Sequence, residues 1–169
     1  MSELAISDIS IGYPVHSGNG IASESEILEK LLDLFIENLK TTESIGRFSE
    51  LQNTLDELTE ILKDCSQDNW DGYNAKPVSI DTYLEAKDII RNLNTSFSNF
   101  PMPEILPEPD GDIAFEWNDQ WGRSFVFSID DNKTITYAGI FGPNKAHGTE
   151  IYRGFIPRAI VDYLRRLYP

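Results

Sequence analysis

The spacing of apolar residues changes from a helical period to a strand period along the chain, and this change limits the folds that the chain can adopt. From residue 27 to residue 62, apolar residues recur every three or four positions, which is typical of amphipathic helices. Between residues 113 and 139 they alternate with polar or small residues instead, as in Ile113, Phe115 and Trp117. This alternation predicts strands. The chain therefore combines helices with a sheet of consecutive strands.

Two amphipathic helices are expected within residues 23–66. A Ser-x-x-Glu capping box at Ser23 marks the start of the first helix, whose apolar stripe ends near Lys40. A second stripe covers residues 47–64. The short connection at residues 41–46 predicts that the two helices form an antiparallel, acidic hairpin.

The remaining residues, 67–169, are expected to form an α+β domain. Ser79 can cap a third helix, and the proline-rich residues 101–109 are expected to be extended but not central in a sheet. Three antiparallel strands form a meander, and a fourth short strand is expected around residues 150–155. Pro157 suits the first turn of a closing helix. The predicted fold is therefore α+β, with the hairpin and the third helix packed on a sheet of three to four strands.

The net charge of −14 is distributed unevenly along the sequence. Residues 1–110 carry 21 acidic and 7 basic residues, whereas residues 111–169 carry 7 of each. A negative field repels nucleic acid and anionic membranes, and it speeds encounter with a basic partner. We therefore expect a basic protein as partner, with no direct contact to nucleic acid or membrane. The alternative is that the acidic residues only keep the protein soluble.

The acidic residues of the second helix and of the turn after it are predicted to bind this partner. They are Glu50, Asp56, Glu57, Glu60, Asp64, Asp68 and Asp71, with Tyr73 beside them. The predicted function is not enzymatic and needs no cofactor. The chain is expected to inhibit or neutralise a basic protein, such as a nucleic-acid-handling enzyme, in the manner of a phage-type inhibitor, an antitoxin or an immunity protein.

Two alternative functions stay open. Carboxylates near the predicted sheet turns can collect a calcium or magnesium ion, and those between Asp110 and Glu116 suggest a metal-assisted hydrolase. Their order does not match an EF-hand loop, so no metal ligand is predicted. The hairpin can also associate with a second copy to form a homodimer. The turn carboxylates are Asp110, Asp112, Glu116, Asp119, Asp130 and Asp131.

The turn at residues 69–74 allows two interpretations. Trp70 and Tyr73 can form an exposed platform for a cationic or planar ligand. Alternatively, Trp70 packs into the core while Asp71 caps backbone amides, and this second interpretation is favoured. The single cysteine, Cys65, excludes an internal disulfide and is expected to be a small buried apolar group in a cytoplasmic protein. Residues 1–22 are expected to be a weakly structured arm without a signal peptide.

Four short motifs occur in order along the chain: NWDGYNAKP at residues 69–77, PDG at 109–111, EW at 116–117 and YAG at 137–139. This series resembles that of a group of small bacterial and phage proteins with a Trp-Asp-Gly motif. The resemblance covers residues 68–168 and leaves the acidic hairpin outside it. It implies a bacterial or phage source, and it transfers no catalytic residue.

Overall fold

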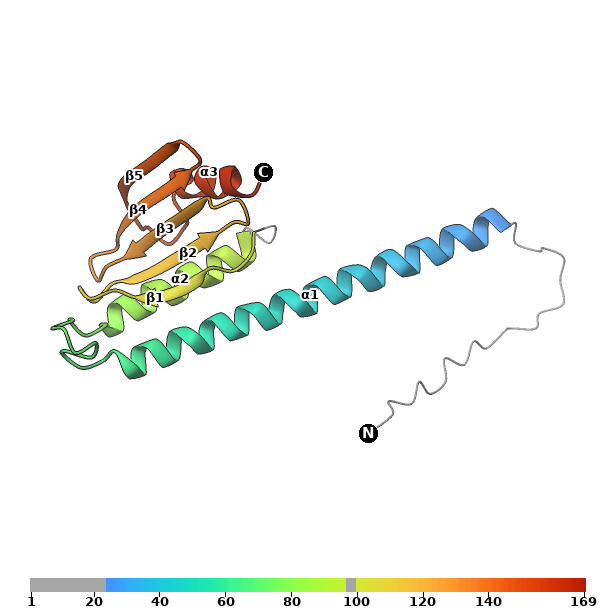
Figure 1. Cartoon of the computed structure of the whole chain (residues 1–169). Helices are drawn as coiled ribbons and strands as arrows, with labels where there is room; N and C mark the ends of the chain where they lie inside the picture. The colour runs from blue at the N-terminus through green and yellow to red at the C-terminus, as the bar shows by residue number, and fades with distance from the viewer. Residues whose placement is uncertain (1–23, 97–99) are drawn as a thin grey trace, which may run out of the picture. The chain divides into compact units, whose positions relative to one another are not determined.

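The computed structural model describes residues 24–96 and 100–169 of the chain. The chain forms two compact units, Met1–Lys40 and Thr41–Pro169, and the second unit contains the sheet. The α+β class is confirmed (Figure 1). The elements are α1 (Glu24–Asp64), α2 (Ile80–Ser96), β1 (Glu104–Pro107), β2 (Ile113–Asn118), β3 (Ser124–Ile129), β4 (Thr134–Phe141), β5 (Asn144–Ile151) and α3 (Arg158–Leu167).

The five strands form one antiparallel sheet in the order β1-β2-β3-β4-β5. Phe115 of β2 lies opposite Phe127 of β3, which in turn lies opposite Tyr137 of β4, so these aromatic residues share one face. Phe115 and Phe127 stack with their ring centroids 4.8 Å apart. The alternation in the sequence therefore places one apolar face against the core, as predicted.

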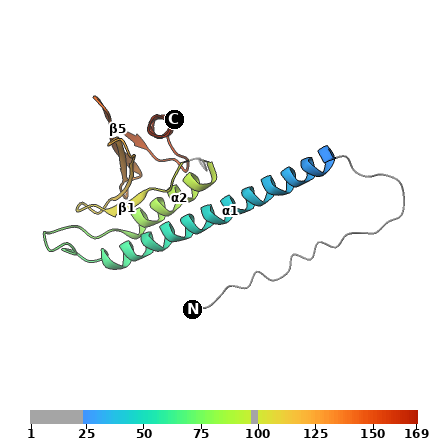
Figure 2. The same cartoon turned by 45° about the vertical axis from the view of Figure 1, so that its right-hand side comes forward.

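Both shorter helices pack on this apolar face of the sheet. Figure 2 shows α2 and α3 on the same side of the sheet, and their buried residues join the strand residues in one core. Tyr163 of α3 stacks on Phe125, with the ring centroids 5.5 Å apart. Four apolar residues of α3 are buried, and Pro157 directly precedes this helix. Ser79 Oγ accepts a hydrogen bond from the Thr82 amide at 3.0 Å, which confirms the predicted cap of α2.

The predicted helical hairpin is wrong, because α1 is one helix of 41 residues. Residues 41–46, expected to turn, are helical. They contain no proline, and a single glycine such as Gly46 costs a helix only about 1 kcal/mol. The part of α1 in the second unit packs on α2: Leu58 is fully buried, and the hydroxyls of Thr59 and Tyr83 lie 3.4 Å apart.

The sheet has two strands beyond the predicted meander. The proline-rich segment supplies β1 at an edge, which agrees with its exclusion from the centre of the sheet. The expected fourth strand begins earlier than predicted, at Asn144, and ends at Ile151. Its residues are mostly polar or small, so their apolar pattern gave little signal.

Two further expectations concern the N-terminus and the membrane. Residues 1–22, predicted to be a weakly structured arm, lie outside the described residues. Within the described ranges, no helix is both long and apolar enough to span a membrane.

Candidate functional site

Five of the predicted partner-binding carboxylates share one exposed face of α1. At 100° per residue, they fall within an arc of about 120° on the side away from the buried Leu58. All five residues are exposed. We call this group the acidic face: Glu50, Asp56, Glu57, Glu60 and Asp64.

Two of the five carboxylates of the acidic face form ion pairs. Arg47 Nη1 lies 3.6 Å from Glu50 Oε2, and Lys63 Nζ lies 3.2 Å from Glu60 Oε2. Partial burial and the nearby Glu104 carboxylate of β1 raise the pKa of Glu57. A neighbouring acid therefore adds to the negative potential at Glu57 instead of cancelling it.

The turn after α1 is held by its own side chains. Asp71 Oδ1 accepts hydrogen bonds from the amides of Tyr73 and Ala75, at 2.7 and 3.1 Å. The Trp70 indole donates to the Lys76 carbonyl at 2.8 Å and packs against the core. These contacts match the favoured interpretation of the turn. Tyr73, by contrast, is 89% exposed.

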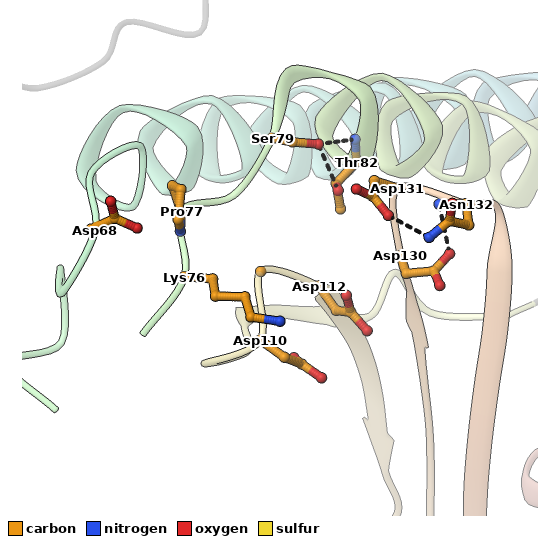
Figure 3. A pocket seen from close by; sticks show the side chains of 11 residues that line it. Asp68, Lys76, Pro77, Ser79, Thr82, Asp110, Asp112, Asp130, Asp131 and Asn132 are labelled. Carbon is orange, nitrogen blue, oxygen red and sulfur yellow. Dashed lines mark hydrogen bonds between the residues drawn. The ribbon is translucent and has the colours of Figure 1, made fainter. Parts of the chain in front are cut away.

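A pocket of about 570 Å³ lies beside this turn, between three chain segments. Figure 3 shows carboxylates from the turn before β2 and from the turn after β3 on its wall, with the first turn of α2 above them. Asp68, which follows α1 by four residues, also lines it. We call this the acidic pocket; its lining is Asp68, Lys76, Pro77, Ser79, Thr82, Asp110, Gly111, Asp112, Asp130, Asp131 and Asn132.

Two of the four sequence motifs meet in the wall of the pocket. The Lys76 amide donates to the Pro109 carbonyl at 2.8 Å. Gly111 has a φ of +96°, and a Cβ there would lie 2.9 Å from the Pro77 carbonyl oxygen. Only glycine fits this position without strain, so the PDG turn is matched to the segment it packs on.

Burial and neighbouring carboxylates raise the pKa of Asp112 in the pocket and of Glu108 beside it. The pKa of Asp112 is raised from 3.8 to about 6. Burial is the largest cause, and the carboxylates of Asp110, Asp130, Glu108 and Asp131 add to it. Burial and the Asp110 carboxylate also raise the pKa of Glu108, against a hydrogen bond with Ser128. Negative charge is therefore concentrated here at neutral pH.

Three of these carboxylates are close enough to share a cation. One oxygen each from Glu108, Asp110 and Asp112 lies within 4.8 Å of the other two. Calcium binds oxygen at 2.3–2.6 Å, so ligands on opposite sides of the ion lie about 5 Å apart. The spacing of the three oxygens suits such an ion, or the ammonium group of a lysine.

The structure divides the turn carboxylates that the sequence suggested as a group. Asp110, Asp112, Asp130 and Asp131 line the acidic pocket. Asp119 belongs to the turn between β2 and β3, where it forms an ion pair with Arg123 and accepts backbone hydrogen bonds.

The other member outside the pocket, Glu116, lies on β2 and accepts a hydrogen bond from Asn118 at 2.8 Å. Sequence reasoning missed Glu108, which the register of β1 against β2 brings opposite Asp112 through a backbone hydrogen bond of 2.9 Å. Glu108 would have been found only if residues 104–107 had been predicted as a strand that pairs with β2.

Cys65 behaves as predicted, as a buried residue at the end of α1. Burial is the main cause that raises the pKa of its thiol, and the Asp64 carboxylate adds to it. A raised pKa leaves less thiolate, which is the nucleophilic form.

Comparison of the chain with protein-family models, curated proteins and solved structures gave no significant match. The similarity to the bacterial and phage group therefore stays a prediction from the four motifs.

Proposed function

We propose that the chain is a non-enzymatic protein that binds a basic protein through its acidic face and acidic pocket. The observation that carries this proposal is the gathering of Glu50, Asp56, Glu57, Glu60 and Asp64 on one exposed side of α1. Acids that only confer solubility need not share a face, whereas a contiguous negative surface attracts a partner of opposite charge.

The acidic pocket extends this surface beyond the helix. Asp68 follows the last carboxylate of the acidic face by four residues and lines the pocket. The clustered carboxylates of Asp110 and Asp112 suit a lysine or arginine side chain, whose charge would relieve their mutual repulsion. A protein surface that binds the phosphate groups of nucleic acid carries lysine and arginine side chains. The partner class is therefore a nucleic-acid-handling enzyme that this chain inhibits or neutralises.

Charge reversal on the acidic face tests the proposal. We expect Glu57→Lys with Glu60→Lys to slow association with the partner by roughly tenfold and to flatten its dependence on salt, because steering by charge sets the rate of encounter. The measurement is capture of proteins from a bacterial lysate on the immobilised chain at two salt concentrations, followed by association kinetics with the retained protein.

The matched control reverses two exposed acids outside both acidic groups, Asp33→Lys with Asp162→Lys, for the same change in net charge. A protein retained by the wild type and by the control, but lost with the Glu57 and Glu60 pair, supports the proposal. Equal retention by all three chains contradicts it.

A second candidate function is binding of a divalent cation, as the metal-assisted hydrolase alternative requires. The 4.8 Å grouping of Glu108, Asp110 and Asp112 favours it. A cation held there should raise the melting temperature in calcium or magnesium, since a ligand that binds only the folded state stabilises it. Asp110→Asn should abolish the rise, and Asp162→Asn should not. No rise with either ion at millimolar concentration argues against this candidate.

A further inference from the structure

The N-terminal part of α1 carries an apolar surface that the described residues leave exposed. Seven large apolar side chains within 12 residues are each 46–60% exposed. At 100° per residue they fall within one arc of about 200°. We call them the apolar stripe: Leu28, Leu31, Leu32, Leu34, Phe35, Ile36 and Leu39.

The size of the apolar stripe fits a protein interface. Six of the seven side chains are aliphatic and one is aromatic, and each is about half exposed, so together they form an apolar patch of several hundred Å². A standard interface takes ~800 Å² from each partner, and the stripe supplies the apolar part of such a surface. Patches of this size on soluble proteins mark interaction sites. In proteins, most of the stability of a helix comes from packing of its apolar face.

The charges beside the apolar stripe favour a second copy of this chain as the occupant. Lys30 and Glu37 flank the stripe on the same side, seven residues apart, which is about two helical turns. In an antiparallel pair of identical helices, equal flanks face each other. Each Lys30 then lies opposite Glu37 of the other copy, and this contact occurs twice.

The other flank repeats this pattern. Glu29 and Lys40 lie 11 residues apart, about three turns, on the remaining side of the stripe. In an antiparallel pair, residues at equal distances on either side of one central position face each other. The position halfway between Glu29 and Lys40 differs by only one residue from the position halfway between Lys30 and Glu37. One antiparallel arrangement therefore places Lys30 opposite Glu37 and Glu29 opposite Lys40, although it also brings the two copies of Asp33 near each other at the centre. A membrane or nucleic acid fits poorly, because the chain carries a net charge of −14.

We propose that the apolar stripe is a dimerisation surface, on which α1 of a second copy packs antiparallel. The contact is symmetric and closed, because the same patch serves both copies. The proposal is independent of the proposed function, since its residues belong to the unit Met1–Lys40 and the acidic face belongs to the other unit.

The first test is the mass of the full chain in solution, measured by sedimentation velocity between about 1 and about 100 µM, which covers the weak end of the affinities of standard interfaces. We expect a dimer that Phe35→Glu weakens by more than ~100-fold, because a charge replaces a central anchor in both copies. Tyr73→Ser, which removes an exposed aromatic residue outside the stripe, should leave the dimer unchanged. A monomer at all concentrations overturns the proposal, as does a dimer that Phe35→Glu does not weaken.

A charge swap tests the antiparallel arrangement without removing apolar surface. Lys30→Glu alone should raise the dissociation constant by about fivefold, since it places like charges together twice. Adding Glu37→Lys should restore the wild-type value, because the exchanged charges again face each other. An unrestored double variant overturns the antiparallel arrangement, and circular dichroism of each variant shows whether α1 has kept its helix.

Discussion

The pKa of Asp112 depends on the burial of its carboxyl group and on the charges around it. It directly precedes β2, and four other carboxylates act on it in addition to its partial burial. A carboxyl group in this setting takes up a proton more readily than it does in the unfolded chain. The protonation of Asp112 therefore links stability to pH.

We predict that Asp112→Asn stabilises the protein at pH 7. The pKa of Asp112 is raised from 3.8 to about 6 in the folded state. Between these two pH values, Asp112 is therefore protonated in the folded protein and ionised in the unfolded chain. Stability from this group is present below about pH 4 and is lost as the pH rises through about 6. The asparagine variant should melt higher than the wild type at pH 7 and at nearly the same temperature at pH 4.

Thermal melts of both chains across this pH range measure the effect. Asp162→Asn is the control, because Asp162 lies between Arg158 and Arg165 on α3 and loses attraction instead of repulsion. A lower melting temperature for Asp112→Asn than for the wild type at pH 7 would contradict the prediction.

At the scale of single elements, the helix starts and the strand alternation were predictable, and the turns between elements were less so. Ser79 caps α2 as its sequence position indicates, because capping depends on local hydrogen bonds. The continuity of α1 through residues 41–46 was not predictable, since their propensities allow both a turn and a helix. β5 was partly missed because its pairing with β4, not its own apolar pattern, makes it a strand.

The same distinction applies to the candidate site. The acidic face follows from helical spacing alone, so the sequence predicted it. The acidic pocket depends on which turns meet, and Asp112 and Asp130 come together only because β2 and β3 pair in one register. Glu108 depends on β1, an element that was expected only as an extended connector.

We predict that Ser79→Ala destabilises α2 and, with it, the whole second unit. The substitution removes the oxygen that accepts from the Thr82 amide, which costs about 1 kcal/mol. Urea unfolding measures the loss. Ser79→Thr keeps a hydroxyl at the cap and should recover most of the stability. Equal stability of the alanine variant and the wild type would show that this cap contributes nothing.

At the scale of the whole molecule, the net charge of −14 opposes folding, because the compact state brings like charges together. The repulsion is long-ranged at low salt, where the screening length is ~30 Å at 0.01 M, and short-ranged at physiological salt, where it is ~8 Å. The free energy of unfolding should therefore depend on salt concentration because of repulsion among all the charged residues, and not because of one ion pair.

We predict that the melting temperature at pH 7 rises when sodium chloride is increased from about 0.01 to about 0.15 M, because this range covers most of the change in screening. The rise should be smaller at pH 4, where many carboxyl groups are protonated. Thermal melts at the four conditions are the measurement. A fall with salt at pH 7 would mean that attractive ion pairs outweigh the repulsion.

The edge strand β1 affects whether the sheets of neighbouring molecules can pair edge to edge. It ends at Pro107, which has no amide hydrogen, and it begins at the exposed Glu104. A strand of a neighbouring molecule that paired with β1 would lack one backbone hydrogen bond, at Pro107, and would meet the negative charge of Glu104. Growth of a fibre by edge-to-edge addition is therefore hindered on this side of the sheet.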